Sequence, residues 1–328
     1  MNLLPSLRYL VALSEHRHFG RAAQACHITQ PALSNALRAL EEEFEAVIVK
    51  RERNYVGFTP EGEIILASAQ RMLHEHALLQ ESLKGDALAP HGPLRIGAVP
   101  TAMPVAARFA AMLQARQSGI RPIVLSLSSA EIENGLETLS LDLAMGYIER
   151  MDSRGARLSA FEQYTEHYFL LRRAENPHAD GLRIGHPLSW QQAGSFPLCL
   201  LTPDMHNRTI VDAALRQAGV QVVPAMETNS ILAMALCVVQ GKMCGILPGA
   251  LVGVVRGDRQ LEALPLVEPE VRTPIGFMFN AQMRPSRAMQ AAMDLARESQ
   301  WLQHAAMHSG MLNSPGEGSA RAPSAPKG

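Results

Sequence analysis

The sequence predicts a small N-terminal helical domain, one long helix and a larger α/β region built from two lobes. Three observations lead to this prediction. Residues 18–41 contain two short helical segments around a turn, with apolar residues at three- and four-residue steps. Residues 61–83 repeat such steps without a break. From residue 94 onward, short apolar segments alternate with helical ones, which is typical of a parallel sheet covered by helices.

The first three predicted helices form a helix-turn-helix arrangement. Residues 19–26 form the second helix, and the first, residues 3–14, carries on one face Leu3, Leu7, Leu10, Val11 and Ser14. Ile28 fills the turn that follows the second helix. Thr29 N-caps the third helix, and Pro31 lies in its first turn, where the missing N–H leaves no hydrogen bond unmade. These local signals predict where the third helix begins.

The third helix has one apolar and one polar face. Leu33, Leu37 and Leu40 recur at three- and four-residue steps and are expected to be buried. The polar face carries side chains of the kind that bind base edges and phosphates in a DNA major groove. Taken alone, this pattern also fits an ordinary helical hairpin with a solvated surface. The DNA-binding residues predicted on this helix are Gln30, Pro31, Ser34, Asn35 and Arg38.

The residues after this helix strengthen the DNA-binding interpretation. An acidic helix end leads into a short basic wing and then into a Thr-Pro-x-Gly motif at residues 59–62. In this order the segment resembles that of LysR-type transcriptional regulators. It departs from the family pattern at His18 and Gly20, where Ser and Thr are usual, and at Glu45 and Val49, where Gly and Phe are usual. The matching positions are Ala22, Ala23, Gln30, Pro31, Leu33, Ser34, Leu40, Glu41, Arg51, Thr59, Pro60 and Gly62.

The resemblance implies both a fold and a function. Residues 1–60 are expected to form a winged helix-turn-helix, all-α with a small β wing, in which Arg51 and Arg53 hold DNA phosphate. The remainder is expected to be similar to the two-lobed α/β fold of periplasmic solute-binding proteins. The implied function is ligand-responsive, sequence-specific transcriptional regulation. The implied partners are a double-stranded DNA operator and a small-molecule effector, with RNA polymerase as a further partner.

The charge balance limits how such a protein contacts DNA. The formal net charge is −1 at pH 7, so the chain as a whole lacks a strongly basic character. Basic residues still gather on the wing, at Lys50, Arg51 and Arg53, apart from the acidic run at residues 41–43. We therefore expect few phosphate contacts per subunit and binding by several subunits together.

Residues 61–90 are predicted to form a linker helix and a hinge. Thr59 and Pro60 supply the N-cap and the first helical position, and the Gly- and Pro-containing residues 85–93 mark the hinge. The helix has the spacing of a coiled-coil seam, which predicts a dimer whose two reading heads face an inverted repeat. A helix packed only on its own domain is the alternative, and the resemblance implies a dimer of dimers. The predicted seam is Ile65, Ala69, Met72, His76, Leu79 and Leu83.

Residues 91–308 are predicted to form the two-lobed effector domain. Lobe I is expected to comprise about 91–163 and 272–304, and lobe II about 164–271, joined by extended segments near 164–172 and 271–279. Residues 309–328 are rich in Ser, Gly, Pro and Ala and are expected to be disordered. The other predicted strands are 94–99, 123–127, 143–148, 198–201, 220–224 and 244–247, and the predicted helices are 103–114, 131–139, 207–217, 230–239 and 286–304.

A ligand pocket is predicted where strands end and helices begin. In open α/β sheets, ligands bind at the carboxyl ends of the strands, where helix N-termini present free N–H groups and a partial positive charge. A small anion, most plausibly a carboxylate, fits such a ring of helix starts. The alternative for any single residue is that its side chain only caps a helix. The candidate effector-binding residues are Thr101, Ser128, Ser129, His206, Asn207 and Asn229, the last beside Thr228.

Other classes of protein are disfavoured by what the sequence lacks. No Ser-His-acid trio, phosphate loop, dinucleotide fingerprint or metal-ligand spacing is found, so no catalytic residue, cofactor or metal is predicted. No membrane span or signal peptide is recognised, so the protein is expected to be cytoplasmic. A small-molecule sensor without DNA binding and an α/β enzyme stay open as alternatives. Four cysteines are expected to be buried structural thiols rather than a redox switch: Cys26, Cys199, Cys237 and Cys244.

Overall fold

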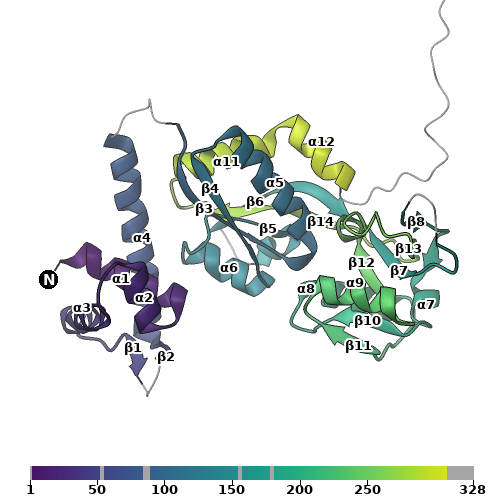
Figure 1. Ribbon diagram of the computed structural model, residues 1–328, viewed down its shortest axis with the longest axis horizontal. Coiled ribbons are helices and arrows are strands. Elements are labelled where there is room, and N and C mark those ends of the chain that lie inside the picture. Colours follow the sequence, from purple (N-terminus) through teal and green to yellow (C-terminus); the bar gives the residue numbers. More distant parts are fainter. Residues whose placement is uncertain (1, 52–54, 84–88, 154–156, 178–180, 309–328) are drawn as a thin grey trace, which may run out of the picture.

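The computed structural model describes residues 2–51, 55–83, 89–153, 157–177 and 181–308. Figure 1 shows an N-terminal helical head, a long helix rising from it, and two α/β lobes beyond. Arg53 of the predicted wing, residues 84–88 of the predicted hinge and the predicted disordered tail at 309–328 lie outside the described residues, and of Arg51 only the backbone is described.

The head is a helix-turn-helix with a two-stranded wing. Its helices are α1 (Leu3–His16), α2 (Phe19–Ala25) and α3 (Gln30–Glu43), and its antiparallel strands are β1 (Val49–Arg51) and β2 (Tyr55–Phe58). Leu7 and Leu10 of α1 share one core with the leucines of α3, whereas Leu3, expected on the same face, is 39 % exposed. Thr29 Oγ1 accepts a hydrogen bond from the backbone N–H of Ala32 and so caps α3.

Two departures from the family pattern compensate each other in the head. His18 takes the N-cap position of α2, and its Nδ1 accepts a hydrogen bond from the Arg21 backbone N–H at 3.2 Å. A Cβ atom at Gly20 would lie 3.1 Å from Cε1 of the His18 ring. Because the imidazole cap is larger than a serine hydroxyl, a glycine beside it leaves room for the ring.

The Thr-Pro-x-Gly motif joins the wing to the long helix α4 (Pro60–Leu83). Thr59 Oγ1 accepts from the Gly62 backbone N–H at 2.9 Å and so caps the helix. A Cβ at Gly62 would lie 2.2 Å from the carbonyl oxygen of Ile48, so only glycine allows this approach. Glu41 completes the joint, since its Oε1 accepts from the backbone N–H groups of Ile48 and Val49 at 3.0 and 3.3 Å.

The long helix packs against the head at one end and leaves apolar side chains uncovered at the other. Leu66 and Ala69 are buried in the core of the head. Met72, Leu79 and Leu83 are 43 %, 58 % and 78 % exposed in the single chain. The head and α4 each contact lobe I: Glu15 of α1 forms an ion pair with Arg95 at 3.3 Å, and His74 of α4 donates a hydrogen bond to the Arg284 carbonyl oxygen at 2.9 Å.

Lobe I is a five-stranded sheet with helices on both faces and strand order β4-β3-β5-β14-β6. Its core joins Phe109, Phe277 and Trp301 in ring contacts of 4.5 and 5.0 Å between centroids. The strands are β3 (Gly92–Ala98), β4 (Ile120–Ser126), β5 (Leu143–Tyr147), β6 (Leu158–Glu166) and β14 (Thr273–Asn280), and the helices are η1 (Pro100–Ala102), α5 (Met103–Arg116), α6 (Ser129–Glu137), η2 (Ile148–Ser153), α11 (Arg287–Arg297) and α12 (Ser299–His308).

Lobe II is a second mixed sheet, of order β11-β10-β12-β7-β13-β8, with β9 paired to β13. The chain enters it from β6 into β7 and returns from β13 into β14, so two strand connections link the lobes. The strands are β7 (Tyr168–Arg173), β8 (Arg183–Ile184), β9 (Leu188–Ser189), β10 (Leu198–Leu201), β11 (Met226–Thr228), β12 (Cys244–Pro248) and β13 (Leu261–Val267), and the helices are α7 (Trp190–Ala193), α8 (His206–Gln217), α9 (Ile231–Gln240) and α10 (Gly249–Val252).

Two element predictions need correction, and one long strand was missed. The strand expected at 220–224 is not formed, and the edge strand is β11 at Met226–Thr228. The single helix expected at 286–304 is two helices, because Glu298 has the extended backbone angles φ −68° and ψ 135°. Strand β13 was not predicted, since Pro265 and Glu262 break its apolar pattern.

Candidate functional site

The predicted DNA-reading residues lie together on the front of α3. Gln30, Pro31, Asn35 and Arg38 are exposed, and Ser34 is half-buried. The leucines of the opposite face are fully buried, so the orientation of α3 is fixed by packing. The structure therefore presents amide, hydroxyl and guanidinium groups on one protruding surface, which is the chemistry that a major groove accepts.

Five of the six predicted effector-binding residues meet where the two lobes approach each other. A small cavity of about 10 Å³ is lined by Thr101, Ser128, Ser129, His206 and Asn207, together with Tyr147. The first three come from lobe I and the next two from the start of α8 in lobe II. Asn229 does not reach this cavity and lines a larger one beside it, which Ser128 also borders.

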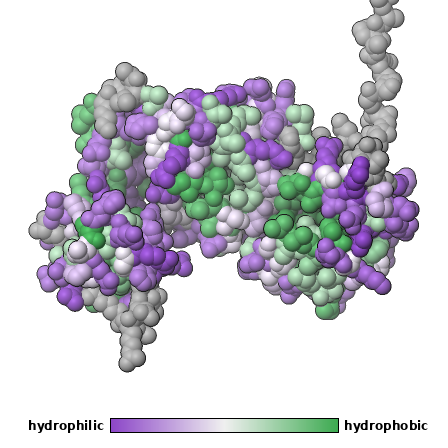
Figure 2. Space-filling model, in the orientation of Figure 1, coloured by the Kyte–Doolittle hydropathy of each residue, from purple (hydrophilic) through white to green (hydrophobic). Residues whose placement is uncertain are grey.

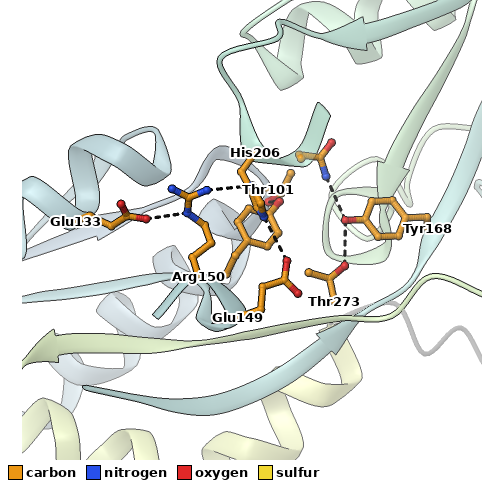
Figure 3. Close-up of polar contacts among 9 residues, drawn as sticks. Thr101, Glu133, Glu149, Arg150, Tyr168, His206 and Thr273 are labelled. Carbon is orange, nitrogen blue, oxygen red and sulfur yellow. Dashed lines mark hydrogen bonds and ion pairs between the residues drawn. The ribbon is translucent and has the colours of Figure 1, made fainter. Parts of the chain in front are cut away.

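A chain of buried hydroxyl and amide groups runs behind the small cavity. Thr101 Oγ1 and the Tyr147 hydroxyl are 2.9 Å apart. On the other side, Asn207 donates to the Tyr168 hydroxyl at 3.4 Å, and Tyr168 contacts Thr273 Oγ1 at 3.4 Å (Figure 3). Burial raises the pKa values of both tyrosines, so they stay protonated and act as neutral hydrogen-bonding groups.

Charged groups form a second link between the lobes at the same place. Arg150 of η2 donates to Glu133 Oε1 at 2.7 Å and to Nδ1 of His206 at 3.2 Å (Figure 3). Because an arginine can only donate, Nδ1 must be unprotonated, and the Nε2–H then donates to Glu149 at 3.2 Å. His206 is thus held in one tautomer between two residues of the other lobe.

A cavity of about 770 Å³ opens next to the small one. Most of its lining is aliphatic, with walls from α5 of lobe I and from α9 and α10 of lobe II. Figure 2 shows hydrophobic surface, in green, on both lobes beside the gap that separates them. Glu131 lines this cavity, but its Oε2 accepts hydrogen bonds from the Ser128 hydroxyl and backbone N–H, both at 2.8 Å.

Comparison with protein families decides how this arrangement is classified. The family model of the LysR substrate binding domain matches residues 88–301, and that of the bacterial regulatory helix-turn-helix protein of the lysR family matches residues 4–63. The chain belongs to the LysR family. The predicted fold class and family are both confirmed, and the protein is a DNA-binding transcriptional regulator rather than an enzyme.

Individual LysR-family proteins are similar over most of the chain. The DNA-binding transcriptional dual regulator OxyR of Escherichia coli is 26 % identical over 284 residues, which cover 83 % of this chain and 88 % of OxyR. A full-length OxyR variant from Pseudomonas aeruginosa has a TM-score of 0.69 at 24 % identity, covering 90 % of this chain and 98 % of that one. CbnR bound to its target DNA has a TM-score of 0.61 at 16 % identity, covering 92 % and 99 %.

Burial makes three of the four cysteines of this LysR-family chain less reactive. Cys199 and Cys244 are buried, while Cys26 and Cys237 are half-buried, which corrects the expectation that all four are buried. Burial raises the pKa of Cys199 to about 11 and raises the pKa values of Cys26 and Cys244. Cys237 Sγ lies 3.3 Å from the Met226 sulfur. Since the thiolate is the nucleophile, these pKa shifts lower reactivity.

The described residues contain neither a metal-ligand cluster nor a helix that is long and apolar enough to cross a membrane.

Sequence reasoning missed Tyr147, Glu149 and Arg150 in this LysR-type cleft. Tyr147 ends strand β5 and the other two follow in η2, so the rule that selected Thr101 and Ser128 applies equally to the end of that strand. The junction carries a tyrosine and two charged residues instead of the small hydroxyl and amide caps found at the other helix starts, which is why it was passed over. Their partners, Glu133 and His206, lie on other elements, and only the fold brings these groups together.

Proposed function

We propose that this regulator binds an inverted-repeat operator as a dimer of dimers and senses a small carboxylate between its lobes. The observation that carries the ligand proposal is the meeting of two helix N-termini, those of α6 and α8, at one small polar cavity. Both helices direct backbone N–H groups and a partial positive charge toward their starts. The space admits about one oxygen atom, and a ligand carboxylate oxygen placed there would accept hydrogen bonds from both lobes at once.

Side chains at the cavity support an anionic ligand. Ser129 Oγ is buried and has no hydrogen-bond partner among the described residues, so it is available as a donor. Thr101, Asn207 and His206 surround the same space. Burying an unpaired hydroxyl is unfavourable, and a ligand oxygen would satisfy it.

Ligand binding would act on the angle between the lobes. A group that contacts α6 and α8 together binds the closed arrangement better than an open one and shifts the population toward it. Lobe I contacts the reading head through Arg95 and Glu15, and it contacts α4 through His74. We therefore propose that closure changes the spacing of the heads and the bend of the DNA, and through it the contact with RNA polymerase.

The DNA-binding part of the proposal rests on α3 and α4. Gln30, Pro31, Ser34, Asn35 and Arg38 would contact the major groove, with Arg51 and Arg53 on phosphate. The exposed Met72, Leu79 and Leu83, with His76, form the face on which a second α4 would pack.

Footprinting on the DNA upstream of the gene itself and of its neighbours tests the proposal. We expect a protected inverted repeat whose boundaries change with one of a panel of small carboxylates. The Ser129→Ala variant should need more of that acid for the same change, whereas Ser195→Ala, an exposed serine of lobe II, should not. No protection at low salt would contradict operator binding and favour a sensor without DNA activity, and turnover of an acid would favour an enzyme.

Peroxide sensing is a second candidate, because several relatives are named hydrogen peroxide-inducible genes activators. The raised pKa values of Cys199 and Cys244 weigh against it, and Cys237 is the half-buried thiol of lobe II, beside the Met226 sulfur. A footprint that changes with hydrogen peroxide, and that no longer changes in Cys237→Ser, would support this candidate over the carboxylate.

A further inference from the structure

The large cavity and the small polar cavity are parts of one interlobe space. Pro100, Ser128 and Met205 line both. A ligand whose polar end lies between the starts of α6 and α8 therefore has the large cavity directly beside it. At about 770 Å³, that space lies in the range of pockets that enclose a whole small molecule.

The walls of the large cavity are aliphatic on both lobes. Met103 and Leu127 contribute from lobe I, and Ile231, Leu251 and Val255 from lobe II. No aromatic ring occurs among the residues found to line it. Methionine side chains adapt their shape to a bound aliphatic group, and Met103 and Met205 border the space from different lobes.

The charges around this space exclude an anionic group from it. Among the described residues that line it there is no lysine, arginine or histidine. Its acidic groups are Asp204 and Glu131, and Glu131 is already held by Ser128. A second carboxylate on the ligand would thus meet like charge and no cation, which disfavours diacids.

Apolar side chains at the rim are left in contact with water. Leu232 and Val254 line the cavity and are 70 % and 59 % exposed. Large exposed apolar residues that converge on one cavity, in contrast to scattered ones, mark a binding surface. An aliphatic group of the ligand would cover them, and lobe closure would then bury that group from both sides.

We infer that the effector is an amphipathic monocarboxylate, with its carboxylate at the starts of α6 and α8 and an uncharged aliphatic body in the 770 Å³ cavity. The inference rests on the proposed function, because it assigns the carboxylate to the small polar cavity. It adds the chemical class of the rest of the molecule. Affinity should then depend on the length of the aliphatic chain.

A series of straight-chain acids tests this inference on the full-length protein. Calorimetric titration with acetate, butyrate, hexanoate, octanoate and decanoate, each below its micelle concentration, should give an affinity that rises roughly fourfold per methylene until the cavity is filled. The primary alcohols of equal length should bind more weakly, because they lack the charge that the two helix starts attract.

A matched pair of variants locates the aliphatic body. Val254→Ser removes apolar surface from the cavity rim, and Val223→Ser makes the same change at a residue that is 93 % exposed and does not line the cavity. Both sites are exposed, so both variants should fold. We expect Val254→Ser to weaken the binding of octanoate several-fold and to leave the affinity for acetate unchanged. Val223→Ser should leave both affinities unchanged.

The outcomes separate this inference from the proposed function. If acids of every length bind equally well and Val254→Ser has no effect, the assignment of an aliphatic body to the large cavity is wrong. The proposed carboxylate site would be unaffected by that result. Binding of no acid by protein that still protects its operator would overturn both the aliphatic body and the carboxylate, but not the DNA-binding regulator. A diacid that binds more tightly than the monoacid of equal length would also overturn the inference.

Discussion

Glu166, the last residue of β6, lies directly opposite Thr273, the first residue of β14, at the point where the chain passes between the lobes. Both side chains are buried. Tyr164 donates to Glu166 Oε1 at 3.5 Å, and Oε2 has no hydrogen-bond partner among the described residues. Burial raises the pKa of the Glu166 carboxyl to about 8, with Tyr147, Tyr164 and Tyr168 nearby. The connection between the lobes thus encloses a carboxyl group that is neutral at pH 7.

This burial predicts a pH-dependent stability. The folded protein keeps the Glu166 proton up to a pH of about 8, whereas the unfolded chain releases it near the ordinary value of 4.5. Stability is therefore lost as pH rises between these values. Glu166→Gln does not ionise, so its unfolding free energy should exceed that of the wild type by an amount that grows with pH, up to a few kcal/mol. Urea unfolding at pH 5 and pH 8 measures the difference.

Glu162→Gln, which changes an exposed carboxylate on the same strand, is the control and should show no such trend. Equal trends in both variants would contradict the assignment of the pH dependence to Glu166.

Direct reading of a base by α3 predicts a change in sequence preference. Asn35 is exposed at the front of the helix, and asparagine pairs bidentately with adenine. Asn35→Ala should reduce the binding free energy that discriminates between bases by about 1 to 3 kcal/mol at one position of the operator. The preference at the other positions should stay unchanged. Binding to a set of single-base operator variants measures this. Glu42→Gln, exposed at the far end of α3, is the control, and an unaltered preference in Asn35→Ala would show that Asn35 reads no base.

The close approach of α4 to the wing predicts that Gly62 tolerates no side chain. Gly62→Ala would place a methyl group 2.2 Å from the Ile48 carbonyl oxygen, and the strain should destabilise the reading head by about 1 to 3 kcal/mol. Thermal unfolding of the full chain measures the loss. Gly257→Ala, where a Cβ would meet nothing within 4 Å, should change little. Equal thermal unfolding midpoints for the two variants would mean that Ile48 and the wing shift away from the added methyl group without strain.

The exposed face of α4 predicts that dimerisation depends on Leu79. It is 58 % exposed in the single chain, and a charge there would be buried at a helix–helix seam. Leu79→Glu should raise the dimer dissociation constant by at least tenfold in sedimentation equilibrium. Gln80→Glu adds the same charge on the neighbouring exposed position and should have a much smaller effect. A dimer that is unchanged by Leu79→Glu would place the subunit contact elsewhere.

Short-range signals explain which features could be read from the sequence. Thr29 as a cap, the leucines of α3 and the Thr59–Gly62 motif act within one or two turns of chain, so spacing predicted these helices, and the family resemblance identified them as a reading head. Strand β10 was placed at its observed bounds, because it is short, apolar and flanked by a helix start. Strand β13 was missed, since Pro265 argues against a strand locally and its partner β7 lies far away in the sequence.

The sequence by itself determined the family, the reading helix and the helix starts that carry hydroxyl, amide and imidazole groups. Tertiary structure alone decided which of those starts meet, so that Thr101 and Asn207 share a cavity while Asn229 borders another. It also decided that Arg150 contacts His206 and that aliphatic walls from both lobes enclose one space. The physical reason is that caps and helical faces depend on neighbours three or four residues away, whereas a cleft depends on how two separately packed sheets are oriented.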